Sequence, residues 1–258
     1  MLKAVNYIGP MSKGKSRPQL FECDDGKQYV VKFMSNPISP NSNKHIVHEI
    51  IANRLAQHLS LPIAKAEVIY FSQEIIENTP QISEFEVKPG PHFGTVYYKN
   101  KARPTNKERI KKCSNLQEMA GVMVFDHWVH NRDRANNLWN LIIDEGEYEN
   151  KLYMIDQAGC FYSSRRNKEK LRDRAHSINM HWGKTYKNFR PFLTHKNSFK
   201  HYVEKIELFP DSDIRDIVFS TPGEWEPDHD ELEAIYKYLT SRKSLVNEII
   251  DNLLNEEF

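Results

Sequence analysis

Two aspartates and one asparagine stand at the ends of apolar segments, and their order limits the possible folds more than any other feature. Asp133 follows a predicted helix, Asn140 opens the short apolar segment 141–143, and Asp156 closes the next predicted strand. Enzymes that transfer phosphoryl groups use one acid to position a hydroxyl group, and an amide with a second acid to hold magnesium. The order therefore predicts phosphoryl transfer, with Asp133 as the catalytic base and Asn140 and Asp156 as Mg²⁺ ligands. Capping of turns is the structural alternative for either aspartate.

The chain carries almost no net charge. Its 258 residues include 36 Lys and Arg and 35 Asp and Glu, so no global field would attract nucleic acid or an anionic membrane. Three widely spaced cysteines argue against a disulfide framework and for a reducing compartment. No apolar stretch approaches the ~18 residues of a membrane-spanning helix. These features predict a soluble cytoplasmic protein with neither a nucleic-acid nor a membrane partner.

The pattern of apolar residues changes near residue 99. Before it, we expect strands over 5–8, 19–23, 28–33, 66–71 and 74–77, and a helix over 44–60. After it, helical spacing dominates. The sequence therefore predicts an α+β, two-lobed protein-kinase-like fold, with a small β-rich N-lobe over 1–98 and a mainly helical C-lobe over 99–258.

Residues 9–16 match the Walker A expression, whose last residues here are Gly14, Lys15 and Ser16. A true P-loop places phosphate at the amino terminus of a helix, but Arg17-Pro18 and an alternating strand follow here. We therefore predict a hairpin loop that covers nucleotide phosphates. A P-loop and an ordinary surface turn are the alternatives.

Lys32 ends an apolar strand and is predicted to neutralise phosphate charge. Its flexible stem needs an acidic partner, and Glu49 on the helix over 44–60 is the nearest candidate. Period-two alternation would place Lys32 on the face opposite Val31 and Phe33. Solvent exposure of both charged residues is the structural alternative.

Two histidine pairs and one basic cluster could also suggest functional sites. The histidine pairs His45/His48 and His127/His130 could each share a helical face, but zinc would need further ligands. Arg165, Arg166 and the basic residues up to 174 follow Asp156, where a substrate segment could lie. A solvated charged loop is the preferred interpretation of this cluster.

The chain resembles the HipA-like kinases, especially the compact branch without the extra amino-terminal subdomain. The residues that carry the resemblance are 25–32, 48–49, 55–56, 59, 61–62, 92–94, Asn131-Arg132-Asp133-Arg134, 140–142, 155–156 and Gly223-Glu224-Trp225. The resemblance implies a fold related to protein and phosphoinositide kinases, with ATP and Mg²⁺ bound between the lobes. It also implies transfer to a Ser or Thr hydroxyl of a protein substrate, and an antitoxin-like partner.

The chain departs from the family pattern at two positions. The usual metal-binding Asn lies five residues after the catalytic Asp, but this position holds Leu138. Asn137 and Asn140 are both candidates, and Asn140 is preferred because a short strand follows it. Ala135 stands where related sequences carry His or Thr. A nucleotide-binding pseudokinase module is therefore one alternative function. A lipid or small-molecule kinase is the other, because phosphoinositide kinases share this style of loop.

Overall fold

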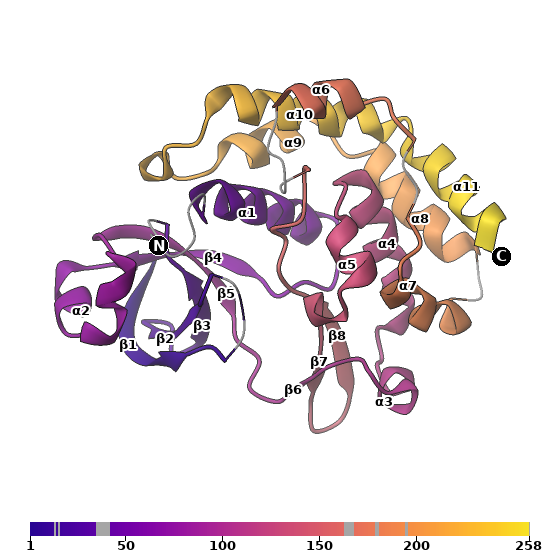
Figure 1. Cartoon of the computed structure of the whole chain (residues 1–258). Coiled ribbons are helices and arrows are strands. Elements are labelled where there is room, and N and C mark those ends of the chain that lie inside the picture. The colour runs from indigo at the N-terminus through magenta and orange to yellow at the C-terminus, as the bar shows by residue number, and fades with distance from the viewer. Residues whose placement is uncertain are drawn as a thin grey trace. The chain divides into compact units, whose positions relative to one another are not determined.

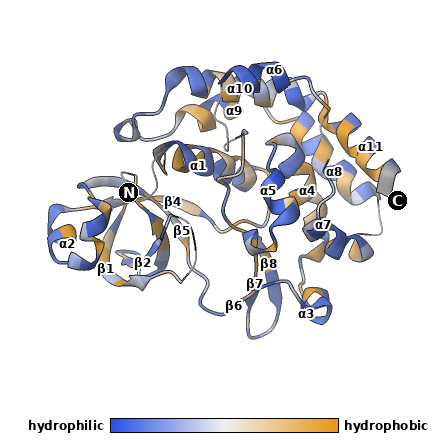
Figure 2. Cartoon of the chain, in the orientation of Figure 1, coloured by the Kyte–Doolittle hydropathy of each residue, from blue (hydrophilic) through white to orange (hydrophobic). Residues whose placement is uncertain are grey.

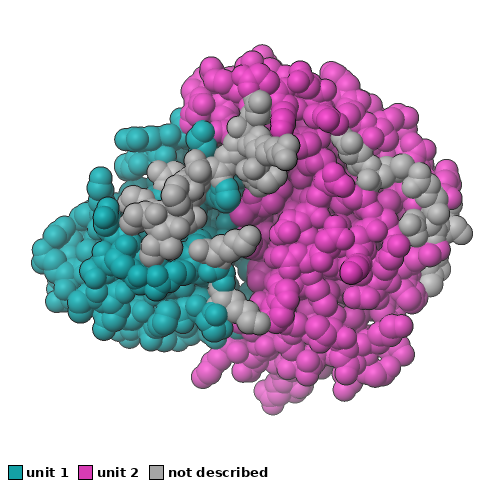
Figure 3. Space-filling view, viewed as in Figure 1, with its two compact units in different colours: residues 1–51, 64–98, 221–227 teal, residues 52–63, 99–220, 228–258 magenta. Residues whose placement is uncertain are grey.

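The chain divides into two compact units. The computed structural model describes residues 1–12, 14, 16–34, 42–162, 168–178, 181–193 and 196–257. Unit 1 comprises Met1–Ile51, Ala64–Tyr98 and Thr221–Pro227, and unit 2 comprises Ala52–Ile63, Lys99–Ser220 and Asp228–Phe258 (Figure 3). Unit 1 therefore includes a short segment from the second half of the sequence.

Unit 1 is built around a closed five-stranded barrel (Figure 1). Its strands are β1 (Leu2–Pro10), β2 (Gln19–Cys23), β3 (Gln28–Lys32), β4 (Ala66–Phe71) and β5 (Gly90–Val96). They pair in the order β1-β2-β3-β5-β4, and a parallel pairing of β1 with β4 closes the barrel. The other pairings are antiparallel.

Aromatic side chains fill the core of unit 1. Phe21, Phe33 and Phe71 are at most 2% exposed, and their rings meet edge to face with centroids 4.8–6.3 Å apart. Burial of each such side chain contributes about 1.5–3 kcal/mol. Because side chains alternate along a strand, burial of Val31 and Phe33 leaves Lys32 on the opposite face of β3.

The predicted strand over 74–77 is wrong, and the last barrel strand was missed. Residues 73–77 form helix α2 (Gln73–Glu77), whose cap Ser72 accepts a hydrogen bond from Ile75 N. A 3₁₀ turn, η1 (Pro80–Phe85), separates α2 from β5. The Pro and Gly residues around position 90 suggested a break, but they lie at the start of β5, where proline is tolerated.

Helix α1 (Ser42–His58) agrees with the helix predicted over 44–60. Its apolar residues Ile46, Ile50, Ile51 and Leu55 are at most 1% exposed, because positions three to four residues apart share one face. The same helix carries Glu49 next to this apolar stripe.

Unit 2 combines helices with a small antiparallel sheet. The sheet has the order β6 (Lys101–Ala102), β7 (Leu141–Glu145) and β8 (Asn150–Met154). The helices are α3 (Lys107–Lys111), α4 (Met119–Trp128), α5 (Arg132–Asn136), α6 (Lys168–Arg174), α7 (Lys184–Phe189), α8 (Lys196–Glu207), α9 (Asp211–Phe219), α10 (His229–Lys243) and α11 (Val246–Glu257), with 3₁₀ turns η2 (Leu116–Glu118), η3 (Leu138–Asn140) and η5 (Arg190–Phe192).

Helix α4 lies at the centre of unit 2. All ten of its residues are buried, and it contacts α8, α10 and α11. The surrounding helices α8 and α11 are amphipathic, with hydrophobic and hydrophilic residues on the same helix (Figure 2). A buried helix followed directly by α5 gives the Asp133 segment a rigid support. None of the described helices is long and apolar enough to span a bilayer.

The segment around Trp225 belongs to unit 1. It forms the 3₁₀ turn η6 (Gly223–Trp225), and the Trp225 side chain is 2% exposed. Its indole Nε1 donates a hydrogen bond to the Pro91 carbonyl at 2.8 Å. Residues 223–225 are among those that carry the family resemblance, and the structure shows that Trp225 packs against β5.

Candidate active site

Lys32 and Glu49 form an ion pair in unit 1. Lys32 Nζ lies 2.5 Å from Glu49 Oε1, and the two side chains are 17% and 3% exposed. Strand β3 directs the lysine away from the aromatic core, and α1 presents the glutamate. The structure therefore contains the ion pair that the sequence suggested, and the alternative, in which both side chains are exposed to solvent, does not apply.

The Walker A match lies in the hairpin between β1 and β2. Pro10 pairs with Gln19, and the Met11 N–H donates to the Pro18 carbonyl at 2.9 Å. Gly14 has φ +126°, and a Cβ atom there would lie 2.8 Å from Pro18 Cδ, so the turn requires glycine.

The hairpin rules out a P-loop. The described residues from Ser16 to Cys23 form a turn and strand β2, so no helix terminus is available there to hold phosphate. Lys15 lies outside the described residues.

Asp133 lies in the first turn of α5. Asp133 is exposed. Its Oδ2 atom accepts hydrogen bonds from Asn140 Nδ2 at 2.7 Å and from Asn137 Nδ2 at 3.4 Å. Gly159 packs against this turn, because a Cβ atom there would lie 3.0 Å from Asp133 Cβ. The two carboxamides thus orient the Asp133 carboxylate.

Asn140 and Asp156 lie at the same end of the β7–β8 hairpin. Leu141 is opposite Met154 in the ladder. One step further, Ile155 N donates to the Asn140 carbonyl at 3.0 Å. Asp156 is the next residue; it is exposed and has φ +57°, a conformation that aspartate tolerates better than most residues. The two predicted metal ligands are therefore neighbours across the end of the hairpin.

The carboxamide oxygens of Asn137 and Asn140 have different partners. Asn137 Oδ1 accepts a hydrogen bond from Trp139 N at 3.1 Å and caps η3. Asn140 Oδ1 accepts a hydrogen bond from Asn137 Nδ2 at 3.2 Å. The Asn137 oxygen thus supports the backbone, whereas the Asn140 oxygen accepts a hydrogen bond from a neighbouring side chain.

A buried ion pair behind this site was missed by the sequence analysis. Arg134 and Asp126 are both fully buried, with Arg134 Nε 2.8 Å from Asp126 Oδ2. Burial alone would lower the pKa of Arg134, but the Asp126 carboxylate, together with Tyr186 and Cys160, raises this pKa above its ordinary value. Burial and the same carboxylate raise the pKa of Tyr186, whose hydroxyl donates to Asp126 at 2.5 Å. The guanidinium therefore stays charged and Tyr186 stays protonated.

The segments before Asp133 and after Asp156 are joined and strained. Phe161 N donates to the Val129 carbonyl at 3.0 Å, and the rings of His130 and Tyr162 stack with centroids 3.7 Å apart. His130, Phe161 and Tyr162 all have positive φ, at 55–56°. Strained backbone that the surrounding structure must hold in place is frequent at functional sites.

The second histidine pair packs in the interior, with His127 in α4 and His130 two residues after the end of this helix. The His127 ring stacks on His181 at 4.1 Å. Burial lowers the pKa of His127 to about 4 and that of His130 to about 3. Across the described part of the chain, no three His, Cys, Asp or Glu side chains are grouped so that they could hold a metal ion. The zinc alternative therefore has no structural support there.

Only part of the basic cluster after Asp156 lies within the described residues. Arg165 and Arg166 lie outside the described residues. Lys168, the first residue of α6, binds Asp230 at 2.8 Å on an exposed surface. Such a contact fits a solvated charged segment.

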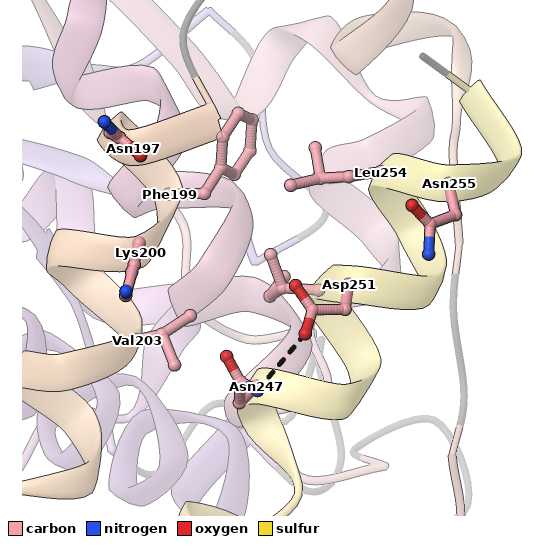
Figure 4. A pocket seen from close by; sticks show the side chains of 9 residues that line it. Asn197, Phe199, Lys200, Val203, Asn247, Asp251, Leu254 and Asn255 are labelled. Carbon is pink, nitrogen blue, oxygen red and sulfur yellow. Dashed lines mark hydrogen bonds between the residues drawn. The ribbon is translucent and has the colours of Figure 1, made fainter.

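A cavity of about 300 Å³ lies between α8 and α11 (Figure 4). Buried Phe199 and Leu254 contribute to its lining, and Asp251 accepts a hydrogen bond from Asn247 at 3.2 Å. The predicted site residues do not line it.

Solved structures with a similar fold include kinases. The Helicobacter pylori proinflammatory kinase CtkA aligns over 99% of this chain and 97% of its own, with a TM-score of 0.63 and 12% identity. The Shewanella oneidensis MR-1 toxin–antitoxin structure of HipA, HipB and operator DNA aligns over 98% and 68%, with a TM-score of 0.50 and 13% identity. The Golgi casein kinase with Mn and ADP bound aligns over 96% and 74%, with a TM-score of 0.50 and 11% identity. These likenesses establish a kinase-like fold.

The family follows from the sequence. The model of the HipA-like kinase family matches residues 4–258. No curated protein sequence gives a significant match. The chain therefore belongs to the HipA-like kinase family, which confirms the resemblance.

Proposed function

We propose that this chain is an ATP- and Mg²⁺-dependent protein kinase that phosphorylates Ser or Thr hydroxyls. The observation that carries the proposal is the grouping of Asp133, Asn140 and Asp156. Asn140 donates to the Asp133 carboxylate at 2.7 Å and lies beside Ile155, the residue before Asp156. Family membership and the kinase-like fold support the same reaction class.

The residues at the hairpin end have the chemistry that Mg²⁺ prefers. Magnesium binds hard oxygen donors, and Asn140 and Asp156 offer an amide oxygen and an exposed carboxylate. Asn140 is the better amide ligand, because Asn137 Oδ1 caps η3. When bound, the metal would neutralise charge on the transferred phosphate. Manganese and ADP in the Golgi casein kinase structure support a metal-bound nucleotide in this fold.

Asp133 would orient the acceptor hydroxyl and take its proton. The amide hydrogen bonds to Oδ2 hold the carboxylate in one orientation, so less order has to be gained when the acceptor binds. A general base of this kind contributes about 10²–10⁴-fold to the rate.

Lys32 would neutralise phosphate charge, and Glu49 would hold the lysine in place. The β1–β2 hairpin, with Gly14 and Ser16, would offer backbone amides to the nucleotide phosphates. Lys15 is part of the same proposal. The acceptor would be a protein, and an antitoxin-like protein is the proposed regulatory partner.

The acceptor class can be identified directly. The purified protein would be incubated with labelled ATP, Mg²⁺ and a cell extract separated into protein, lipid and small-molecule fractions, beside the Asp133→Ala variant. We expect label on Ser or Thr of protein with the wild type alone. Label confined to lipid or small molecules would contradict the proposed substrate, and binding of ATP without any transfer would indicate a pseudokinase.

A further inference from the structure

Arg134 contacts one proposed metal ligand and the residues on both sides of the other. It directly follows Asp133, yet its side chain is fully buried, whereas Asp133 is exposed. The guanidinium donates to two backbone carbonyls: Asn140 O at 2.8 Å and Ile155 O at 2.9 Å. It also donates to Gln157 Oε1. A single side chain therefore contacts the residue before β7 and the residue after β8, at one end of the hairpin.

These partners surround the proposed metal ligands. Asn140 is one ligand, and Ile155 and Gln157 are the residues immediately before and after Asp156. Just past the β7–β8 ladder, Ile155 N donates to the Asn140 carbonyl, and the chain then turns at Asp156 with φ +57°. The guanidinium thus holds the backbone carbonyl before the turn that presents the Asp156 carboxylate, and the Gln157 side chain after it.

The guanidinium is itself held from the opposite side. Nε binds Asp126 of the buried helix α4, and Tyr186 of α7 donates to the same carboxylate oxygen. The planar group of arginine can make several fixed hydrogen bonds at once, which a lysine ammonium cannot reproduce in the same plane. Through these hydrogen bonds, the buried helix α4 holds the end of the β7–β8 hairpin in place.

We propose that Arg134 is a positioning residue that sets the separation of Asn140 and Asp156 and thereby the affinity for the divalent metal. This inference rests on the proposed kinase function. Groups that orient metal ligands, without touching the metal, commonly change metal affinity by about 10–100-fold when they are replaced.

The test compares two buried arginines. Arg134→Lys keeps a positive charge for Asp126 but cannot keep all of the contacts to the hairpin end. Arg242→Lys is the matched control, because Arg242 is also 0% exposed and donates to the carbonyls of Trp128, Ser177 and His127. ATP binding would be measured by calorimetry over a range of Mg²⁺ concentrations, together with thermal unfolding of each protein without ligand.

We expect Arg134→Lys to raise the Mg²⁺ concentration for half-maximal ATP binding by about 10–100-fold. Arg242→Lys should leave it within about twofold, even where both variants lower the unfolding temperature. Equal effects of the two substitutions on the Mg²⁺ requirement would overturn the inference and reduce Arg134 to a structural role. Wild-type protein without Mg²⁺-dependent ATP binding would overturn the proposed function as well, so the two failures are distinguishable.

Gln157→Met gives an independent measurement if Arg134→Lys does not fold. It removes one acceptor of the guanidinium and leaves the Arg134–Asp126 pair in place. A smaller increase in the Mg²⁺ requirement, of a few-fold, supports the positioning role. An unchanged requirement in this variant contradicts it.

Discussion

The contact between Lys32 and Glu49 is largely shielded from water, which distinguishes it from the surface ion pairs of the same unit. Lys32 is 17% exposed and Glu49 is 3% exposed. Lys27 and Asp25 are 3.6 Å apart, and the lysine is 67% exposed. Exposed pairs contribute only about 0–1 kcal/mol, whereas loss of one partner from a buried pair costs several times more.

We therefore expect Lys32→Ala to remove most phosphoryl transfer and to lower the unfolding temperature, because Glu49 loses its cation. Lys27→Ala should change neither property appreciably. Initial rates with saturating ATP and thermal unfolding curves would be measured for both. Full activity of Lys32→Ala would exclude this lysine from the mechanism.

The two asparagines should also behave differently. Asn140→Ala should raise the Mg²⁺ requirement by more than about tenfold, since an oxygen near Asp156 is lost. Asn137→Ala should mainly cost about 1 kcal/mol of stability, because it removes the cap of η3. Magnesium titrations of turnover and urea unfolding separate the two effects, and a larger metal effect for Asn137→Ala would reverse the assignment.

Single residues differ in how far their neighbours can be predicted. Asp133, Asn140 and Asp156 could be proposed from the sequence, because residue type and order along the chain are enough to suggest them. The role of Arg134 was not predicted, because its partners lie at Asp126, Asn140, Ile155 and Gln157, between 6 and 23 residues away. No local pattern shows which of these residues will meet.

At the level of elements, hydrophobic periodicity was reliable where the segment was long, as in α1. It failed for α2, because five residues contain too few repeats to separate a helix from a strand. β5 was missed, because Gly and Pro suggested a break at its first residues. The Walker A letters were correctly set aside, since the element that follows them, and not the letters, decides the chemistry.

The packing of α7 against α5 supports the element that carries Asp133. Gly183 caps α7, and a Cβ atom there would lie 2.0 Å from the Ala135 carbonyl of α5. We expect Gly183→Ala to cost about 1–3 kcal/mol and to lower activity, because backbone must shift. Gly223→Ala is the control, since nothing lies within 4 Å of its Cβ position, and it should stay within about 0.5 kcal/mol.

Urea unfolding and initial rates for both glycine variants test this packing. Unchanged stability and activity of Gly183→Ala would show that α5 accommodates the methyl group and does not depend on this contact.

Across the whole molecule, buried histidines should make stability depend on pH. Burial lowers the pKa of His92 and His127 to about 4 and that of His130 to about 3, and it also lowers the pKa of His181. An unfolded histidine has a pKa near ~6.5, so the unfolded chain binds more protons below this pH. The free energy of unfolding should therefore fall as the pH drops from about 6.5 towards about 4.

Urea unfolding between pH 7.5 and 4 measures this slope, whose limit for each such histidine is about 1.4 kcal/mol per pH unit between the pKa of the unfolded chain and that of the folded protein. His130→Phe keeps an aromatic ring against Tyr162 and should make the slope shallower. The exposed His201→Gln should leave the slope unchanged. An identical slope for wild type and His130→Phe would mean that His130 is already protonated in the folded protein.

The fold class was predictable for the molecule as a whole, because strand signals come first and helical signals dominate later. The course of the chain was not. Residues 52–63 belong to unit 2, and residues 221–227 return to unit 1 through the hydrogen bond from Trp225 to Pro91. Such a return depends on contacts between residues more than a hundred positions apart, which periodicity does not encode.

The central claim is that Asp133 acts on the acceptor while Asn140 and Asp156 hold the metal. Single-turnover transfer of labelled phosphate, measured beside the affinity for Mg²⁺-ATP, tests it most directly in the wild type and in Asp133→Ala. We expect Asp133→Ala to lose transfer by at least about 10²-fold while its Mg²⁺-ATP affinity stays within several-fold. Transfer at the wild-type rate by Asp133→Ala would contradict the account.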